Sequence, residues 1–358
     1  MKITVLGVGL IGGSIGLAAR EGIEGVEVVG YGRSPERLAR AVALEAIDRA
    51  AGSVEDALDG AHACFCCAPV GALPDQVAAA LAAAPAGCAV SDVGSVKRQL
   101  AESFADERFV GGHPVAGAET AGVEHARADL FDGAVWYLTP SKSSSGIVLE
   151  RLHRLVAALR ARPVAIDAES HDRMLATVSH LPHVLANVLV SQLAHRLGER
   201  GEQRPRVGPS FRDVTRVAGA NSSVWTDIYL SNAGAIADEI DAMTHGLDEV
   251  SAKLRAGDSE AIAEWNDAAR DDRRRLLEAD AAGGPVHELR AAVPNRPGVV
   301  AEVALALGRA GINISDMALA PAPDMRSGQI TLWIAGDAPA ARARELVTEL
   351  DFPIVTAE

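Results

Sequence analysis

The feature that most constrains the fold is a glycine-rich turn near the start of the chain. An apolar run from Lys2 to Leu6 is typical of a short buried strand, the sequence Gly7-Val8-Gly9-Leu10-Ile11-Gly12 follows at once, and small apolar residues from Gly12 to Arg20 predict a helix. In such a unit the first glycine permits the tight turn, the second lets the backbone approach a pyrophosphate, and the third lets helix and strand pack closely. The helix N-terminus adds free N–H groups and a positive dipole end. We therefore predict a dinucleotide site contacted by Gly7, Gly9, Leu10, Ile11 and Gly12.

The same segment has an alternative interpretation as a secretory signal peptide, because Lys2 precedes an apolar run that extends to Ala19. Glycines and Ser14 interrupt that run, and a second strand follows at the distance expected of a βαβ unit. This context favours the nucleotide-binding interpretation.

Composition limits the remaining function classes. The 358 residues predict two or three domains, and 48% hydrophobic residues allow a sizeable core in each. A net charge of −14 argues against nucleic-acid binding, which needs clustered Lys and Arg, although a few arginines inside a pocket still suit an anionic substrate. The longest apolar stretches contain glycine, histidine or charge, so we expect no membrane span. Cys64, Cys66, Cys67 and Cys88 fall in predicted strands, which favours buried thiols in a reducing cytoplasm and no metal site.

The first part of the chain, residues 1–167, alternates strands and helices, which predicts a doubly wound parallel sheet of Rossmann type. After the first strand, further strands are expected at Val26–Tyr31, Ala63–Cys67, Cys88–Asp92, Phe109–Gly111 and Val135–Leu138. Ligands of such sheets lie at the carboxyl ends of the strands. That rule places at the site the turn at residues 7–12 and the segments Gly32-Arg33-Ser34, Ala68-Pro69-Val70, Asp92-Val93-Gly94-Ser95 and Gly112-His113-Pro114.

Residues 168–280 contain no convincing strand and predict an all-helical domain. Apolar residues recur at helical spacing from Met174 to Leu189, with an expected kink at Pro182. Two more amphipathic patterns cover Ile228–Arg255 and Ser259–Ala279. Because the first helix is apolar over much of its circumference, we expect it to pack against a second subunit.

After a linker at residues 281–286, residues 287–358 predict a ferredoxin-like βαββαβ domain. Its expected elements are the strand His287–Val293, the helix Gly298–Arg309 with Gly311 as its C-cap, the strands Asn313–Ala320 and Gln329–Ala335, the helix Asp337–Leu350 and the strand Pro353–Thr356.

The end of the second strand indicates the cofactor type. An NAD site usually has Asp or Glu there to hold the ribose 2′-hydroxyl, whereas this chain has Gly32, Arg33 and Ser34. A missing carboxylate beside an arginine suits a 2′-phosphate, so the local chemistry favours NADP over NAD. The alternative is a solvent-exposed surface arginine.

His113 is the candidate for proton transfer, because it follows a predicted strand, lies among glycines and precedes a proline. Histidine titrates near neutral pH, which suits a base for an alcohol that loses hydride. Ser95 lies in the same crevice and is a candidate partner, with a helix cap as its ordinary role.

Three residues of the helical part are further candidates. His180 and His183, at i and i+3 on one helix face, suit the lining of a polar pocket, and one of them is alternatively a buried structural histidine. A zinc site with His171 or His113 lacks a supporting motif. Arg216 suits bidentate binding of a carboxylate, and an ion pair with Asp213 is the alternative.

Taken together, these segments resemble the prephenate dehydrogenase family, which includes arogenate and cyclohexadienyl dehydrogenases. The matching pieces, in the family's order, are GVGLIGGSIGLA at the start, DVGSVK at 92–97, GGHPVAGAETAG at 111–122, SHLPH at 179–183 and FRDVTRVA at 211–218, followed by Trp225-Thr226-Asp227. The end of the chain resembles an ACT domain, with Pro294-Asn295-Arg296-Pro297-Gly298 in its first loop and Gly311-Ile312-Asn313-Ile314 at its second strand.

The resemblance implies a function. The family oxidises prephenate at its ring carbinol by hydride transfer to NAD or NADP, and loss of CO2 then gives 4-hydroxyphenylpyruvate, the precursor of tyrosine. It implies that His113 deprotonates the ring hydroxyl with help from Ser95, that Arg216, His183 and His180 bind substrate, and that Glu119 lines the pocket mouth. It also implies a homodimer through the helical domain, and tyrosine as an effector at Asn295, Pro297, Gly298, Asn313 and Ile314. The position of Ala68 and Pro69 after a strand separately predicts a cofactor contact there.

Several alternatives stay open. Prephenate and arogenate are not distinguished by any side chain, and many family members keep Asp at the position of Gly32. A β-hydroxyacid or imine dehydrogenase would normally use a lysine of its helical domain, yet Lys253 is the only lysine between residues 150 and 280. A non-catalytic sensor of NADP and an amino acid fits poorly with Ser95, His113, His183 and Arg216 together. A purely structural ACT domain is the alternative to a regulatory one.

Overall fold

The computed structural model describes residues 1–117, 120–200, 207–280, 285–294, 314–322 and 327–355, together with Val299, Val303, Ala306, Leu307, Ala310 and Ile312. The chain forms two compact units, Met1–His245 and Gly246–Glu358. The first contains the predicted nucleotide-binding part and most of the helical part.

A five-stranded parallel sheet forms the centre of the first unit, as the alternating pattern predicts. Its order is β3 (Arg49–Ala50), β2 (Glu27–Tyr31), β1 (Lys2–Leu6), β4 (Ala63–Cys66) and β5 (Ala89–Asp92). Leu6 pairs with Tyr31 on one side and with Cys66 on the other, so the carboxyl ends of the three central strands meet at one edge. The order reverses beside β1, which places the glycine-rich turn at the switch point where such sheets bind ligands.

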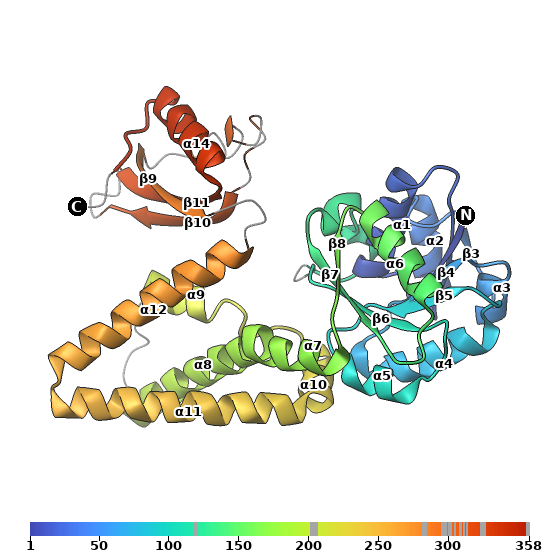
Figure 1. Ribbon diagram of the computed structural model, residues 1–358, viewed down its shortest axis with the longest axis horizontal. Helices are drawn as coiled ribbons and strands as arrows, with labels where there is room; N and C mark the ends of the chain where they lie inside the picture. The colour runs from blue at the N-terminus through green and yellow to red at the C-terminus, as the bar shows by residue number, and fades with distance from the viewer. Residues whose placement is uncertain are drawn as a thin grey trace. The chain divides into compact units, whose positions relative to one another are not determined.

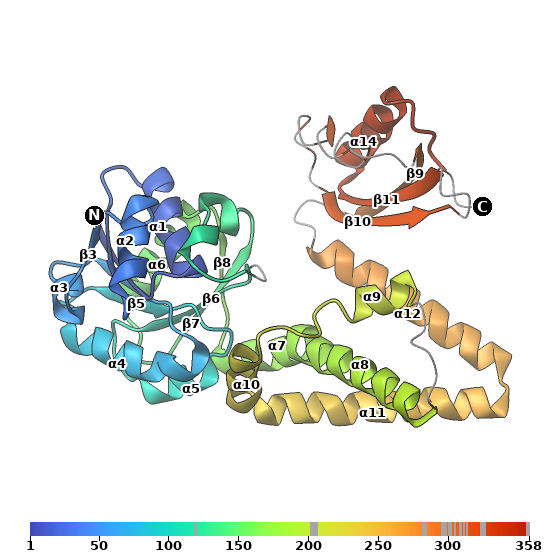
Figure 2. The ribbon, with the colours of Figure 1, turned by 180° about the vertical axis from the view of Figure 1, so that it is seen from behind.

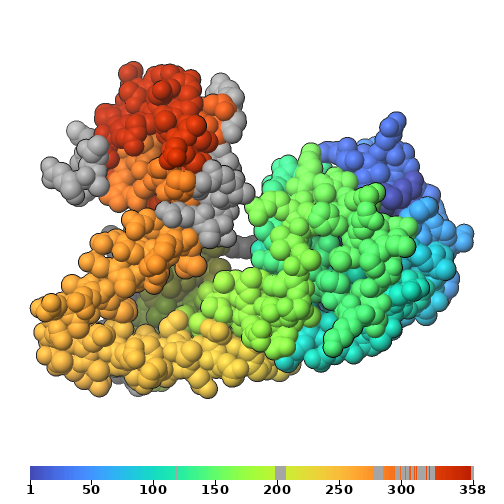
Figure 3. All heavy atoms as spheres, in the orientation of Figure 1, coloured from blue at the N-terminus to red at the C-terminus, as the bar shows by residue number. Residues whose placement is uncertain are grey.

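Two layers of helices cover this sheet (Figure 1). Side chains of α1 (Leu10–Gly22), α2 (Pro35–Ala43) and α6 (Gly146–Ala158) pack on one face, and those of α3 (Val54–Leu58), α4 (Leu73–Ala83) and α5 (Arg98–Ser103) pack on the other. The same two layers are visible from behind in Figure 2. The blue-to-green atoms of this part form one closely packed body in the space-filling view (Figure 3).

The four cysteines belong to this packing. Cys64, Cys66 and Cys88 are buried in the core between the sheet and the α3–α5 layer, and all four thiols are free. Burial raises the pKa of the Cys67 thiol well above its ordinary value, which keeps it protonated and unreactive.

The rest of the predicted parallel sheet is a separate mixed sheet, which corrects the expectation of one parallel sheet. Strands β6 (Val110–Pro114) and β7 (Val135–Pro140) pair antiparallel, and β7 pairs in parallel with β8 (Arg162–Ala165). The segment from β6 to β7 contains only the short 3₁₀ turns η2 (Val123–His125) and η3 (Ala128–Phe131), and strands without a helical crossover pair antiparallel. A parallel bridge between Val90 and Phe109 joins the two sheets.

A long helical run begins the helical part. It comprises α7 (Ala168–Leu175), the π-helical turn η4 (Ala176–His180) and α8 (Leu181–Arg200). This π turn lies directly before Pro182, where the sequence predicts a kink. Proline lacks an N–H and crowds the carbonyl four residues earlier, and a π turn relieves both conflicts without ending the helix. Residues Ala168–Leu197 pass a length and hydropathy test for a membrane span, with a mean hydropathy of 1.3, as core helices of water-soluble proteins also do.

The expected helix Ile228–Arg255 is divided in two. After α9 (Pro209–Val214), α10 (Ser222–Ser231) ends at Asn232 and α11 (Ala233–Ala256) begins directly after it. Asn232 is buried, and its side-chain amide donates to the carbonyl of Asp172 at 2.8 Å. A buried asparagine that bonds to another helix thus interrupts a pattern that is continuous in the sequence.

The second unit contains α12 (Ser259–Asp280), β9 (Val286–Pro294), β10 (Ile314–Pro321), β11 (Ser327–Ala335) and α14 (Asp337–Glu349). The strands form a small antiparallel sheet in the order β10, β11, β9, and Ile354 bridges Ala291 of β9. The predicted helix Gly298–Arg309 is described only at single positions, of which Val299, Val303 and Leu307 are buried at helical spacing. Four of the predicted effector residues lie outside the described residues: Asn295, Pro297, Gly298 and Asn313. The predicted cap Gly311 also lies outside them. The fifth predicted effector residue, Ile314, begins β10.

Candidate active site

The geometry of the glycine-rich turn matches the three roles expected of its glycines. Gly7 has a φ of +98°, which a side chain would strain, and a Cβ at Gly12 would lie 2.3 Å from the carbonyl oxygen of Gly7. A Cβ at Gly9 would meet no atom within 4 Å. The fold itself therefore requires the first and third glycines, whereas the second leaves open space in front of the N-terminus of α1. Gly9 is the N-cap of that helix and provides no side-chain cap, so the N–H groups of its first turn remain available to a ligand.

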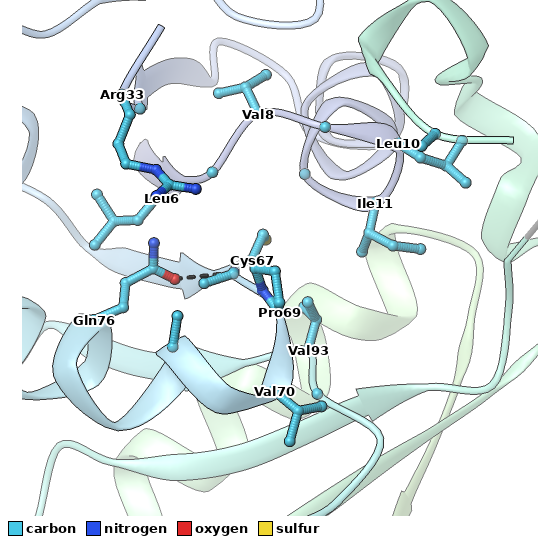
Figure 4. A pocket seen from close by; sticks show the side chains of 18 of the residues that line it. Leu6, Val8, Leu10, Ile11, Arg33, Cys67, Pro69, Val70, Gln76 and Val93 are labelled. Carbon is cyan, nitrogen blue, oxygen red and sulfur yellow. Dashed lines mark hydrogen bonds between the residues drawn. The ribbon is translucent and has the colours of Figure 1, made fainter. Parts of the chain in front are cut away.

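A cavity of about 910 Å³ opens in front of this turn. Figure 4 shows Arg33, Leu6 and Gln76 on one side of it and Leu10 and Ile11 on the other, where α1 begins. Gln76 accepts a hydrogen bond from the main-chain N–H of Ala68 at 3.1 Å, which fixes the loop after β4. The cavity brings together all the residues that the sequence predicts as cofactor contacts: Gly7, Gly9, Leu10, Ile11, Gly12, Arg33, Ser34, Ala68, Pro69 and Ser95.

The end of the cavity beside β2 is positively charged. Arg33 and Arg37 are both exposed and line it, and neither side chain forms an ion pair with another described residue. Ser34 also caps α2, since its Oγ accepts from the N–H of Arg37 at 3.3 Å. Within the described lining, Asp75 is the only acidic residue. This end is therefore suited to an anionic group.

His113 also lines the cavity, but it lies within β6 and not in the loop after a strand, which corrects the sequence expectation. The residue is 8% exposed, and its Nδ1 lies 2.9 Å from Nε2 of His171. Burial lowers the pKa of His113 well below its ordinary value, and His171, Lys97 and His180 lower it further. The imidazole is therefore unprotonated at neutral pH and can accept a proton.

A buried ion pair holds the loop that carries Ser95 against the strand that carries His113. The side chains of Lys97 and Asp92 are in contact, and Lys97 Nζ donates to the carbonyl of Gly112 at 2.7 Å. Asp92 accepts from the N–H groups of Gly94 at 2.8 Å and Gly112 at 3.1 Å. Lys97 is also the N-cap of α5, so Ser95 is not the helix cap that was its alternative role.

His180 and His183 lie deeper in the helical part and are not in the cavity lining. His183 stacks on the Trp225 ring at 3.5 Å, and its Nδ1 contacts the Tyr229 hydroxyl. His180 Nδ1 lies 3.2 Å from the Asn232 amide, while its Nε2 is buried without a partner among the described residues. Burial lowers the pKa of His180 to about 4, which keeps its ring neutral. The helical part touches the cavity through Val224, next to Trp225.

The remaining two predicted substrate residues are Arg216 and Glu119. Arg216 is exposed in the turn after α9 and is absent from the lining, although the main chain of its neighbour Val217 interacts with His183. Glu119 lies outside the described residues. The lining therefore contains His113 but not Arg216, and a substrate contact shared by the two residues stays a prediction.

Sequence reasoning missed the role of His171 and Asp172, which stand behind His113. The only signal in the sequence is the His-Asp pair in the first helix after the last strand of the nucleotide-binding part. The contact of His113 with His171 joins residues 58 positions apart, which no local pattern reveals.

Comparisons with protein families match most of the chain. Residues 15–165 match the family model described as "Prephenate dehydrogenase, nucleotide-binding domain", and residues 167–267 match "Prephenate dehydrogenase, dimerization domain". The chain is 30% identical to the prephenate dehydrogenase of Bacillus subtilis (strain 168), over 97% of this chain and 96% of that protein.

Solved structures agree with this match. A prephenate dehydrogenase from Aquifex aeolicus, in complex with hydroxyphenyl propionate and NAD+, aligns with a TM-score of 0.71 at 28% identity, covering 77% of this chain and 98% of that one. An arogenate dehydrogenase from Synechocystis aligns with a TM-score of 0.68 at 25% identity, covering 77% and 100%.

Proposed function

The chain belongs to the prephenate dehydrogenase family, and we propose that it catalyses the NAD(P)-dependent oxidative decarboxylation of prephenate to 4-hydroxyphenylpyruvate. One observation carries the proposal: a single cavity is lined by the dinucleotide turn, by Ser95 and by the unprotonated imidazole of His113. The residues fit a dinucleotide because the space in front of Gly9 is open and the first turn of α1 keeps its N–H groups free.

The proposed reaction needs only one proton-transferring side chain. The first turn of α1 and the residues around Arg33 would hold the dinucleotide, which would supply the hydride acceptor for the ring carbinol carbon. His113 takes the hydroxyl proton at its cavity-facing nitrogen, so that the carbinol becomes a ketone. The bond to the ring carboxylate then breaks, CO2 leaves, and its electron pair aromatises the ring. The phenolate oxygen recovers the proton from His113, so the reaction needs no further acid.

We also propose that Ser95 helps orient the substrate hydroxyl, that Arg216 and His183 bind the substrate's carboxylates, and that His180 is a further substrate contact. The Nε2 of His180 is buried without a partner among the described residues, and His183 lies beside Trp225, which supports a ligand site in this region. For Arg216 the support is its sequence motif and the contact of Val217 with His183.

For the cofactor we propose a preference for NADP. Arg33 and Arg37 line the cavity beside the end of β2, where Gly32 stands in place of a carboxylate. A guanidinium pair attracts a 2′-phosphate, whereas a carboxylate would repel it and bind a 2′-hydroxyl.

The test is an assay that follows formation of the reduced cofactor for NAD and NADP, each with prephenate and arogenate. We expect turnover with prephenate and a higher kcat/KM with NADP. Arogenate is the second candidate substrate, because of the similarity to the Synechocystis arogenate dehydrogenase, and turnover with arogenate alone would establish it. No turnover with either substrate would contradict the proposed function.

We further propose that the protein is located in the cytoplasm. We also propose that it forms a homodimer through the helical part. The match to a dimerization domain supports the dimer, as do exposed apolar side chains at Val188, Leu189 and Leu230, of which Leu230 is 74% exposed. Sedimentation equilibrium should give twice the chain mass, and Leu230→Glu should lower that mass toward the monomer. A monomer at all concentrations would contradict the proposal.

We also propose that residues 287–358 of the second unit form an ACT-type domain that binds tyrosine. Its strands follow the order Ile354, β9, β11, β10 in an antiparallel sheet, and α14 and the buried Val299, Val303 and Leu307 pack in its core. This arrangement supports the βαββαβ pattern of the sequence.

A further inference from the structure

Behind His113 lie His171 and Asp172, two buried residues that have no part in the reaction proposed above. His171 is fully buried in α7, and its two ring nitrogens contact different partners. Its Nε2 lies 2.9 Å from Nδ1 of His113, and its Nδ1 lies 2.7 Å from Oδ1 of Asp172. The His113 and His171 rings meet edge to face, with centroids 5.1 Å apart.

The protonation state of this chain follows from the partners of Asp172. Its Oδ1 accepts from the main-chain N–H of Lys97 at 2.8 Å, and its Oδ2 accepts from that of Arg98 at 2.9 Å. Because both oxygens act as acceptors, Asp172 is a carboxylate. A carboxylate can only accept, so His171 Nδ1 carries a proton.

The direction of the next hydrogen bond follows from the same rule. In a neutral His171 the other nitrogen, Nε2, has no proton and must accept. His113 Nδ1 therefore donates, which leaves the lone pair of His113 on Nε2. No described residue bonds to this Nε2, and His113 lines the cavity.

We infer that His171 and Asp172 are positioning residues, which hold His113 in the tautomer whose free Nε2 faces the cavity. His171 also gives the Nδ1 proton of a protonated His113 a route toward the Asp172 carboxylate, so that the positive charge formed during the reaction is stabilised. The role in catalysis rests on the proposed function, whereas the tautomer does not.

We infer a neutral His171 before the reaction from the positive charge that already lies beside it. The ring is buried, and a second positive charge would lie near Lys97, which already interacts with His113. The ring of Tyr137 packs edge to face on His171 with centroids 5.5 Å apart. The titratable groups that face the two imidazoles are Asp92, Lys97, Tyr137, Asp172 and His180.

The first test reads the tautomer directly and needs no substrate. Protein labelled with 15N-histidine is measured by long-range 1H–15N correlation, and His113 is assigned from its loss in the His113→Asn spectrum. We expect the His113 proton on Nδ1 and the His171 proton on Nδ1. A His113 proton on Nε2, or a doubly protonated His171 at neutral pH, would overturn the inference whether or not the enzyme accepts prephenate.

The second test compares two substitutions of His171. A glutamine can accept from His113 with its Oε1 and donate to Asp172 with its Nε2, whereas a leucine can do neither. We expect His171→Leu to lower kcat about 10²-fold with KM nearly unchanged, and His171→Gln to recover most of that loss. The dissociation constant for NADPH, measured by fluorescence titration, should stay the same in both.

The control is His153→Leu on α6, an exposed histidine outside the site, which should leave kcat unchanged. A His171→Leu enzyme that keeps its kcat, or equal losses in the leucine and glutamine variants with intact cofactor binding, would overturn the positioning role. If the leucine variant does not fold, the glutamine variant and the spectrum of the unmodified protein still decide the matter.

Discussion

At the scale of single residues, His113 gains its chemistry from burial. A histidine in water is half protonated near pH 6.5, and such a base would lose activity in mildly acidic solution. Here burial and the neighbouring His171 and Lys97 lower the pKa of His113 well below that value. The residue is therefore ready to accept a proton throughout the neutral range, at the cost of being a weaker base.

The first prediction concerns this pKa. The reactive form of His113 is the unprotonated one, so kcat/KM should be flat around pH 7 and should fall only as the pH drops through the lowered pKa. His113→Asn should remove this acidic limb and lower turnover by about 10²-fold or more, with cofactor binding intact. The measurements are a pH–rate profile and an NADPH titration. A limb that persists in the asparagine variant would assign the titration to another group.

The second prediction concerns Arg33 and Arg37 at the β2 end of the cavity. If they bind a 2′-phosphate, Arg33→Ala should raise the KM for NADP about tenfold or more, because a charge-assisted hydrogen bond contributes about 1.5–3 kcal/mol. The KM for NAD should change little, since NAD lacks that phosphate. Arg154→Ala on α6, which lies outside the cavity lining, is the matched control. Equal increases for both cofactors would contradict the 2′-phosphate role.

At the scale of elements, predictions from the sequence are most accurate where a single local rule determines the structure. The strand–turn–helix unit from Lys2 onward forms as expected, because a φ of +98° at Gly7 and close packing at Gly12 leave few alternatives. Predictions from the sequence are less accurate where contacts between distant residues determine the structure. The break at Asn232 depends on a hydrogen bond to Asp172, and the antiparallel pairing of β6 depends on how the chain returns to it.

The third prediction separates two glycines of the same turn. Gly9→Ala meets open space in the free protein, so its melting temperature should stay the same while NADPH affinity falls, because the new methyl group takes space reserved for the pyrophosphate. Gly12→Ala meets the Gly7 carbonyl oxygen at 2.3 Å and should destabilise the fold by about 1–3 kcal/mol or more. Thermal unfolding and a cofactor titration measure both effects. A destabilised Gly9→Ala with normal affinity would reverse the two roles.

At the scale of the whole molecule, the candidate site joins segments that are distant in the chain. It could be predicted that the proposed cofactor contacts line one cavity, because each follows a strand of one parallel sheet and the carboxyl ends of such strands meet at one edge. The partners of His113 could not be predicted, because α7 supplies them after a second, mixed sheet whose geometry no motif encodes. The proposed substrate contact at Arg216 is predicted by motif alone, and its position after α9 puts it outside the cavity lining.

The last prediction concerns regulation through the second unit. If this unit is an ACT-type domain that binds tyrosine and favours a less active state, saturating tyrosine should lower turnover and also raise the melting temperature, because a ligand at about 100 times its Kd stabilises the folded state by about 2.7 kcal/mol. Tyrosine also resembles the aromatic product of the reaction, so inhibition alone does not locate its site. Asn313→Ala, at a predicted effector position, should abolish both responses while leaving turnover without tyrosine unchanged, and D-tyrosine should have no effect. Inhibition that competes with prephenate and survives Asn313→Ala would place tyrosine at the dehydrogenase site, and no change in turnover or melting temperature would contradict a regulatory role.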